Sequence, residues 1–239
     1  MHRFYTAKID PILGTAQLDE AETRHLRDVL RIREGETVNL FDGGGHEFRA
    51  RVDNISKRTT WLTVAEEVRP AAPESPLDLT LAVALTKGEK FELVVQKAVE
   101  LGVNRIIPIV THRCDIKPAG NSKRTLRWRK IALDASKQSG RARLIEIEDA
   151  KAISSLMAAE FPGTKFLFSE RDGDRFEKIS TGNNVLAVVG PEGGWEDGEL
   201  GSAADAGFQI ITLGGRILRA ETAAISIAAV IQHRFGDLN

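Results

Sequence analysis

The fold is decided by the stretch Val185-Leu186-Ala187-Val188-Val189-Gly190-Pro191-Glu192-Gly193-Gly194. Its first five residues are a short, wholly apolar run, which is typical of a strand buried on both faces of a sheet. A helix is expected soon after the glycines, at 197–206. In open α/β sheets, ligands bind beyond the carboxyl ends of the strands. The loop is equally consistent with a plain turn that needs glycine for positive φ.

The alternation of strands and helices extends to both sides of this stretch. Further strands are expected at 77–85, 105–110, 144–147, 165–168 and 209–213. The helices are expected at 90–101, 123–139, 152–159, 197–206 and 220–234. This pattern predicts an α/β fold with a mostly parallel sheet that is covered on both faces.

The first 70 residues have a different pattern. Strands are expected at 3–5, 37–41, 47–52 and 60–64, with one helix from Glu20 to Leu30 that Asp19 caps. Prolines at positions 70, 73 and 76 indicate a semi-rigid connection. We therefore predict a small β-rich domain at 1–70, a proline-rich linker at 71–76 and an α/β domain at 77–239.

Composition excludes several classes of protein. A hydrophobic content of 42% is too high for a disordered chain. No run approaches the ~18 apolar residues of a membrane span, and the first residues lack the apolar core of a signal peptide. The single cysteine, Cys114, fits a reducing cytoplasm. With one cysteine and five histidines, we expect no metal site.

Charge is unevenly distributed along the chain. The 33 basic and 34 acidic residues nearly cancel, but residues 111–143 hold ten basic and two acidic residues. Residues 144–239 hold eight basic and fifteen acidic residues. A solvated helix face usually mixes both signs, so the basic segment favours contact with phosphate. Trp128, within this segment, either stacks on a base or belongs to the core, and its apolar neighbours favour the core.

Two further loops follow expected strands, at 166–171 and 213–222. With the loop at 190–194, they place three strand ends along one crevice. None of the three carries the G-x-x-x-x-G-K-[ST] or G-x-G-x-x-G pattern, which disfavours ATP and NAD. The final helix is apolar over more than one face, so it is either a buried core helix or, as we favour, part of a dimer interface.

Five motifs in the same order along the chain carry a resemblance to a known family. One is a C-terminal signature in two parts, Gly190-Pro191-Glu192-Gly193-Gly194 followed by Leu213-Gly214-x-Arg216-Ile217-Leu218-Arg219-x-Glu221-Thr222-Ala223. The others are His25-Leu26-x-x-Val29-Leu30-Arg31, Lys87-Gly88-Glu89-Lys90 with Gln96-Lys97-x-x-Glu100-Leu101-Gly102, Gln138-Ser139-x-Arg141, and Arg234-Phe235-Gly236. The chain resembles the SPOUT methyltransferases and, among them, the bacterial RsmE-type family.

The resemblance implies a C-terminal SPOUT domain with a deep trefoil knot, preceded by a PUA-like RNA-binding β-barrel. It implies methylation by S-adenosylmethionine of N3 of one uridine, 1498 in the usual numbering, in the 16S rRNA of the small ribosomal subunit. It also implies a homodimer that forms through the knotted domain. The cofactor-binding residues it implies are Leu167, Phe168, Ser169, Glu170, Val189, Gly190, Pro191, Glu192, Gly193, Gly194, Leu213, Gly214, Ile217, Leu218 and Arg219.

Methylation at uracil N3 displaces a weakly acidic proton, so a cation that stabilises the developing anion would help. We expect Arg219 to supply this cation, with Glu221 and Thr222 shaping the site. Glu221 is either a base or a structural partner of an arginine. The candidate RNA contacts are Arg3, Arg24, His25, Arg27, Arg31, Lys123, Arg124, Arg127 and Arg141. For those in the N-terminal domain, Arg3, Arg24, His25, Arg27 and Arg31, a second interpretation is nearly as good: they are exposed charges without an RNA contact.

Two positions depart from the family pattern. Lys137 stands where the family often has Glu, and Glu196-Asp197 stands where it often has Ser or Thr. We expect Asp197 to cap the helix that follows. Two other functions remain open: a methyltransferase of the same superfamily with another RNA target, and a non-catalytic RNA-binding module in ribosome assembly that keeps the fold.

Overall fold

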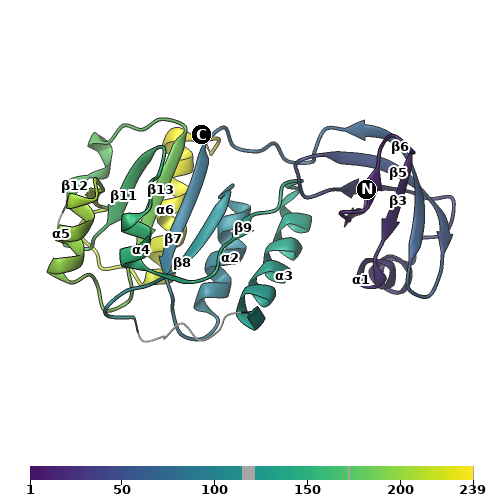
Figure 1. Ribbon diagram of the computed structural model, residues 1–239. Helices are drawn as coiled ribbons and strands as arrows, with labels where there is room; N and C mark the ends of the chain where they lie inside the picture. The colour runs from purple at the N-terminus through teal and green to yellow at the C-terminus, as the bar shows by residue number, and fades with distance from the viewer. Residues whose placement is uncertain (115–121, 172, 239) are drawn as a thin grey trace. The chain divides into compact units, whose positions relative to one another are not determined.

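The computed structural model describes residues 1–114, 122–171 and 173–238 (Figure 1). Its internal contacts divide the chain into two compact units. The first unit holds Met1–Glu74 and Leu133–Leu144, and the second holds Ser75–Ala132 and Ile145–Asn239. The helix α3 (Ser122–Ser139) therefore begins in the second unit and ends in the first.

The first unit is built on a six-stranded sheet in the order β1-β4-β5-β6-β3-β2. Its strands are β1 (Arg3–Tyr5), β2 (Ile9–Asp10), β3 (Thr15–Leu18), β4 (Thr37–Phe41), β5 (Glu47–Ile55) and β6 (Thr60–Val68). Only β1 and β4 pair in parallel, and the other pairs are antiparallel. Alternating side chains such as Leu40, Val52 and Leu62 point inward and form the core.

The expected single helix from Glu20 to Leu30 is wrong in its second half. The helix α1 (Glu20–Arg24) begins at the Asp19 cap as predicted, since the side chain of Asp19 accepts a hydrogen bond from the backbone N–H of Glu22. The chain continues as the π-helical turn η1 (His25–Val29). The wider turn changes the register, so Leu26 stays buried while Val29 is 64% exposed.

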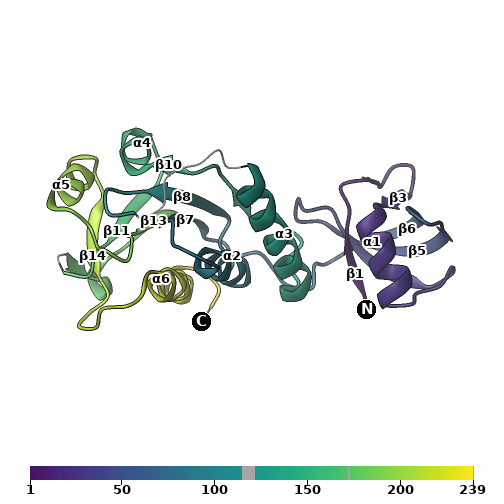
Figure 2. The same ribbon diagram turned by 90° about the horizontal axis from the view of Figure 1, so that it is seen from below.

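The second unit has the predicted α/β architecture, with a wholly parallel sheet in the order β10-β8-β7-β13-β11-β14-β12 and β9 beside β8. Its strands are β7 (Asp78–Ala84), β8 (Arg105–Val110), β9 (Glu146–Ile147), β10 (Lys151–Ala152), β11 (Thr164–Phe168), β12 (Asp174–Arg175), β13 (Asn184–Val189) and β14 (Gln209–Thr212). The helices are α2 (Lys90–Glu100), α4 (Ile153–Ala158), α5 (Asp197–Asp205) and α6 (Ala220–Phe235), with the short η2 (Phe176–Lys178). Figure 2 shows α2 and α6 on one face of the sheet and α4 and α5 on the other, as predicted.

The start of α5 corrects one prediction. Glu196, not Asp197, is the cap residue, and its backbone N–H donates to the carboxylate of Glu199 three residues on, at 3.1 Å. The side chain of Asp197 turns instead to Arg171, at 2.7 Å. A carboxylate on the third helical residue can satisfy the cap from inside the helix, so no Ser or Thr is needed.

Candidate active site

The three predicted strand ends do lie side by side. β11 is flanked by β13 and β14, and Phe168 at its end pairs with Val189 on one side and Ile211 on the other. The loops that leave these ends surround a hollow of about 560 Å³ that is partly open to solvent.

Nine of the fifteen predicted cofactor residues line this hollow. They are Phe168, Ser169, Glu170, Val189, Gly190, Pro191, Leu213, Gly214 and Leu218. They come from all three loops, so the structure brings together segments that lie up to 50 residues apart in the sequence. Their cofactor role stays a prediction, but their placement is the arrangement that such a role requires.

The other six predicted cofactor residues do not line the hollow. Leu167 is fully buried within β11. Glu192 pairs with Lys90 at the start of α2, and the carbonyl of Gly193 accepts a hydrogen bond from Arg113 at 3.0 Å. Gly194 has a φ of +71°, the left-handed region that favours glycine, and it ends the turn that begins at Pro191. The remaining two are Ile217, which is exposed, and Arg219, which comes just before α6.

Six residues that line the hollow were not predicted from the sequence: Trp195, Thr212, Arg216, Ala220, Ala223 and Ile227. Three of them, Ala220, Ala223 and Ile227, recur at helical spacing in the first two turns of α6. That spacing puts them on one face, so the pattern could have indicated a helix wall. Trp195 directly follows the glycine loop. A large aromatic residue at that place could have indicated that it lines the hollow.

The three predicted catalytic residues cluster at the start of α6. Arg219 is the exposed residue that precedes the helix, and its carbonyl accepts the N–H of Ala223 at 2.8 Å. Thr222 is exposed in the first turn. Glu221 is half-buried, and its Oε2 atom is enclosed without a hydrogen-bond partner among the described residues. A helix N-terminus carries partial positive charge, so this cluster adds to the positive potential beside the hollow.

The basic part of α3 is mostly solvent-facing. Lys123 and Arg124 are exposed, and Arg127 is exposed while it pairs with Glu92 at 2.7 Å. Trp128 is buried against Phe91, with ring centroids 4.5 Å apart, which confirms its place in the core. Lys117, another residue of the basic segment, lies outside the described residues.

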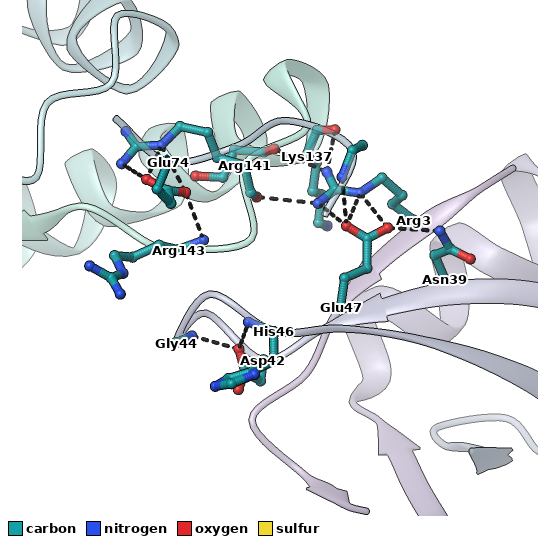
Figure 3. A network of polar contacts seen from close by, with 12 residues as sticks. Arg3, Asn39, Asp42, Gly44, His46, Glu47, Glu74, Lys137, Arg141 and Arg143 are labelled. Carbon is teal, nitrogen blue, oxygen red and sulfur yellow. Dashed lines mark hydrogen bonds and ion pairs between the residues drawn. The ribbon is translucent and has the colours of Figure 1, made fainter. Parts of the chain in front are cut away.

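A buried polar network holds the end of α3 in the first unit (Figure 3). Arg3 pairs with the buried Glu47 at 2.9 Å and donates to the backbone oxygens of Ser136 and Lys137. Arg141 is similarly enclosed and pairs with Glu74 at 2.6 Å. Both arginines therefore have internal partners, and their contact with RNA stays a prediction.

The remaining RNA candidates lie on or after the first helix. Arg24 pairs with Glu20 at 3.4 Å, and both are largely exposed. Arg27 is bound to Asp28, and this hydrogen bond raises the pKa of Arg27 while it lowers the pKa of Asp28. His25 is exposed and its ring meets Phe4 edge-on, and Arg31 is exposed with a φ of +55°. These side chains are accessible, and no contact with RNA follows from accessibility alone.

Known families match both parts of the chain. Residues 73–232 match the family described as an RNA methyltransferase domain, and residues 18–64 match the RNA methyltransferase PUA domain. None of the helices in the described part of the chain is long and apolar enough to cross a membrane.

Individual relatives extend over nearly the full length. "Ribosomal RNA small subunit methyltransferase E" of Synechocystis is 33% identical over 93% of this chain and 74% of its own length. The protein of the same name from Buchnera aphidicola subsp. Schizaphis graminum is 30% identical over 99% and 98%. The crystal structure of such a methyltransferase from Neisseria gonorrhoeae, bound to S-adenosyl methionine, is 34% identical, covers both chains completely and superimposes with a TM-score of 0.92. A methyltransferase structure from Legionella pneumophila with bound SAM is 32% identical, covers 99% and 98%, and has a TM-score of 0.90.

Proposed function

This chain belongs to the family of RNA methyltransferases that carry a PUA domain, and we propose that it methylates N3 of uridine 1498 in the 16S rRNA of the small ribosomal subunit. The methyl donor is S-adenosylmethionine, which supplies a methyl group that is already activated. The task left to the chain is to bind and orient the cofactor and the uridine, and to exclude water from them. Since ribosomal subunits are cytoplasmic, the proposed substrate places the enzyme in the cytoplasm.

The single observation that carries this proposal is the hollow formed by the three loops after β11, β13 and β14. Its lining suits an amphipathic ligand such as S-adenosylmethionine. Leu218, Phe168 and Ile227 offer apolar surface to a purine ring, while Glu170 and Ser169 offer polar groups to hydroxyls. The residues present thus fit the cofactor that the two related structures hold.

The chain's own contribution to the chemistry is assigned to the start of α6. Arg219 stabilises the negative charge that develops on the uracil as N3 loses its proton. Glu221 and Thr222 shape the site, and the enclosed Glu221 oxygen lies within this cluster. Because uracil N3 lies on the base-pairing edge, the base must be unpaired when it enters.

Two further features complete the proposal. The exposed cations Lys123, Arg124 and Arg127 on α3 contact rRNA phosphates. Such contacts depend on the charge of the phosphate and not on the base sequence of the RNA.

The C-terminal domain is knotted, and a second copy packs against it. Exposed apolar side chains in the loop before α6, Ile217 at 87% and Leu218 at 38%, support such a packing, because apolar surface of this kind is usually covered.

Replacement of Arg219 by Ala tests the chemical assignment. We expect methyl transfer to small ribosomal subunits from a methylation-deficient strain to fall by about 100-fold or more, the usual effect of losing one group that stabilises transition-state charge. Calorimetry should show unchanged binding of S-adenosylmethionine. Arg175→Ala, which removes an exposed arginine of β12, is the matched control and should keep full activity. Wild-type turnover by the Arg219 variant would refute the assignment.

A further inference from the structure

One side chain joins two of the three loops around the hollow. Trp195 is 1% exposed, and its indole N–H donates to the backbone oxygen of Phe168 at 2.8 Å. Phe168 is the last residue of β11, where the chain turns into the loop at Ser169 and Glu170. Trp195 itself follows the glycine loop after β13. The hydrogen bond therefore crosses from one loop to the next beneath the hollow.

The surrounding backbone is built to receive the indole. A Cβ atom on Gly190 would lie 2.7 Å from Cε2 of Trp195, so only glycine leaves room for the ring at that position. The connection also runs in the reverse direction. Arg171, three residues after Phe168, donates to the backbone oxygen of Trp195 at 2.8 Å and to Asp197 at 2.7 Å. Each loop thus binds the backbone of the other.

The third loop lacks a comparable connection. Residues 213–219 are exposed along their whole length, and none of the side-chain hydrogen bonds found among the described residues involves them. The geometry of the hollow is therefore fixed on the side of Trp195. A buried, charge-free hydrogen bond of this kind fixes the relative position of the two segments that it joins.

We propose that the indole N–H of Trp195 is a positioning group that holds the loops at 168–170 and 190–191 at the separation required by S-adenosylmethionine. It acts through these loops and sets the affinity for the cofactor, not the rate of methyl transfer from the bound cofactor. This inference rests on the proposed function, since it assigns a role within the same site.

Replacement of Trp195 by Phe tests the inference, because it removes the N–H and keeps an aromatic ring. We expect the Kd and KM for S-adenosylmethionine to rise about tenfold, the effect of losing one buried hydrogen bond. At saturating cofactor, kcat should stay within about twofold, and the KM for the ribosomal subunit should not change. Trp128→Phe, at the other buried tryptophan of this unit, is the matched control and should leave the Kd and KM for S-adenosylmethionine unchanged.

The competing outcomes are distinct. A merely structural role would lower the fraction of active enzyme, so kcat would fall at an unchanged KM for S-adenosylmethionine, and the inference would be overturned. Equal cofactor affinity in Trp195→Phe and the wild type would also overturn it. If the wild type itself binds no S-adenosylmethionine, the proposed function fails instead.

A second test uses the wild-type protein alone, so it does not depend on whether a variant folds. The indole N–H of Trp195 gives a proton resonance that can be assigned among the three tryptophans. We expect it to exchange slowly with solvent in the absence of cofactor, because the hydrogen bond is formed before the ligand arrives. Exchange as fast as that of the half-exposed Trp61 would contradict a pre-formed connection.

Discussion

The side chain of Lys137 connects the end of α3 to α1. Its ammonium group pairs with Glu22 of α1, and the Glu22 side chain is 8% exposed. The same segment is held by Arg3, which donates to the last carbonyls of α3. A cation suits this place, because Glu22 is otherwise enclosed as an unpaired charge and the end of a helix carries partial negative charge.

Replacement of Lys137 by Glu, the residue that the family often carries, should therefore destabilise this protein. We expect a loss of about 2 kcal/mol in the free energy of unfolding, since two carboxylates would face each other at a site with little solvent. Chemical denaturation measures the change. Adding Glu22→Lys to the same chain reverses the pair and should recover most of the loss. Equal stability of Lys137→Glu and the wild type would show that the pair is not formed.

His46 gives a prediction about pH. Its ring is hydrogen-bonded to the carboxylate of Glu67 at 2.7 Å, and this contact, with the charge of Asp42, raises the pKa of His46 above its ordinary value of 6.5. The folded state thus favours the protonated ring. The resulting stabilisation is fully present below pH 6.5 and is lost as the pH rises through the higher pKa of the folded protein.

Titration of His46 by NMR checks this directly. We expect the wild-type pKa to exceed 6.5 and Glu67→Gln to move it back toward that value. The effect on the unfolding temperature should be small, because both side chains are 59% exposed and water screens the pair. An identical pKa in the wild type and the variant would contradict the assignment.

At the scale of elements, α3 combines two tasks. Its first part, in the second unit, exposes Lys123, Arg124 and Arg127, while Trp128 fixes the helix by packing against Phe91. Its end, in the first unit, is bound by the polar network around Arg3. The basic segment is therefore only partly a free charged surface, since its later members have internal partners.

Neutralising Lys123, Arg124 and Arg127 to Gln should weaken binding of rRNA and reduce its salt dependence. Each lost phosphate contact lowers the slope of log K against log salt by roughly 0.7–0.9, so the slope should fall by about 2. A variant with Lys151, Arg175 and Lys178 changed to Gln alters the net charge equally and should keep the slope. An unchanged slope in the α3 variant would show that these three residues are ordinary solvated charges that do not contact phosphate.

Element positions were largely predictable because each long strand and helix carries its own periodic pattern. The apolar run at 185–189 and the spaced apolar residues of 90–101 needed no tertiary information. The π-helical turn at His25–Val29 was not predictable, since its sequence reads as an ordinary helix and the deviation depends on packing against the sheet. The edge strands β10 and β12 are two residues long and have no pattern to detect.

The candidate site was predictable to a similar degree. Strand ends and glycine loops identified the residues of the hollow that come from loops, such as Gly190 and Leu213. The wall formed by Ala220, Ala223 and Ile227 was missed, because small and apolar residues in a helix look like core until the sheet beside them is known. The pairing of Arg3 with Glu47 and of Arg141 with Glu74 was also not predictable, since those partners lie 44 and 67 residues away along the chain.

For the whole molecule, the near-zero net charge conceals two different surfaces. The excess of basic residues lies at 111–143, and the acidic surplus lies at 144–239, the part of the chain that forms the hollow. The charged residues that line the hollow are one acid and one base, Glu170 and Arg216, so the acidic surplus is not concentrated in the hollow itself. The proposed phosphate contacts on α3 and the proposed cofactor site thus come from different segments of the chain.

The identity of the methylated nucleoside decides whether this protein is a uridine N3-methyltransferase of the 16S rRNA. Small ribosomal subunits from a strain that lacks this methylation are incubated with the protein and S-adenosylmethionine, and the rRNA is digested and analysed by chromatography and mass spectrometry. We expect one 3-methyluridine per subunit, at position 1498 of the 16S rRNA. A methyl group on a ribose 2′-hydroxyl or on any other base, or no methyl transfer at all, would contradict it.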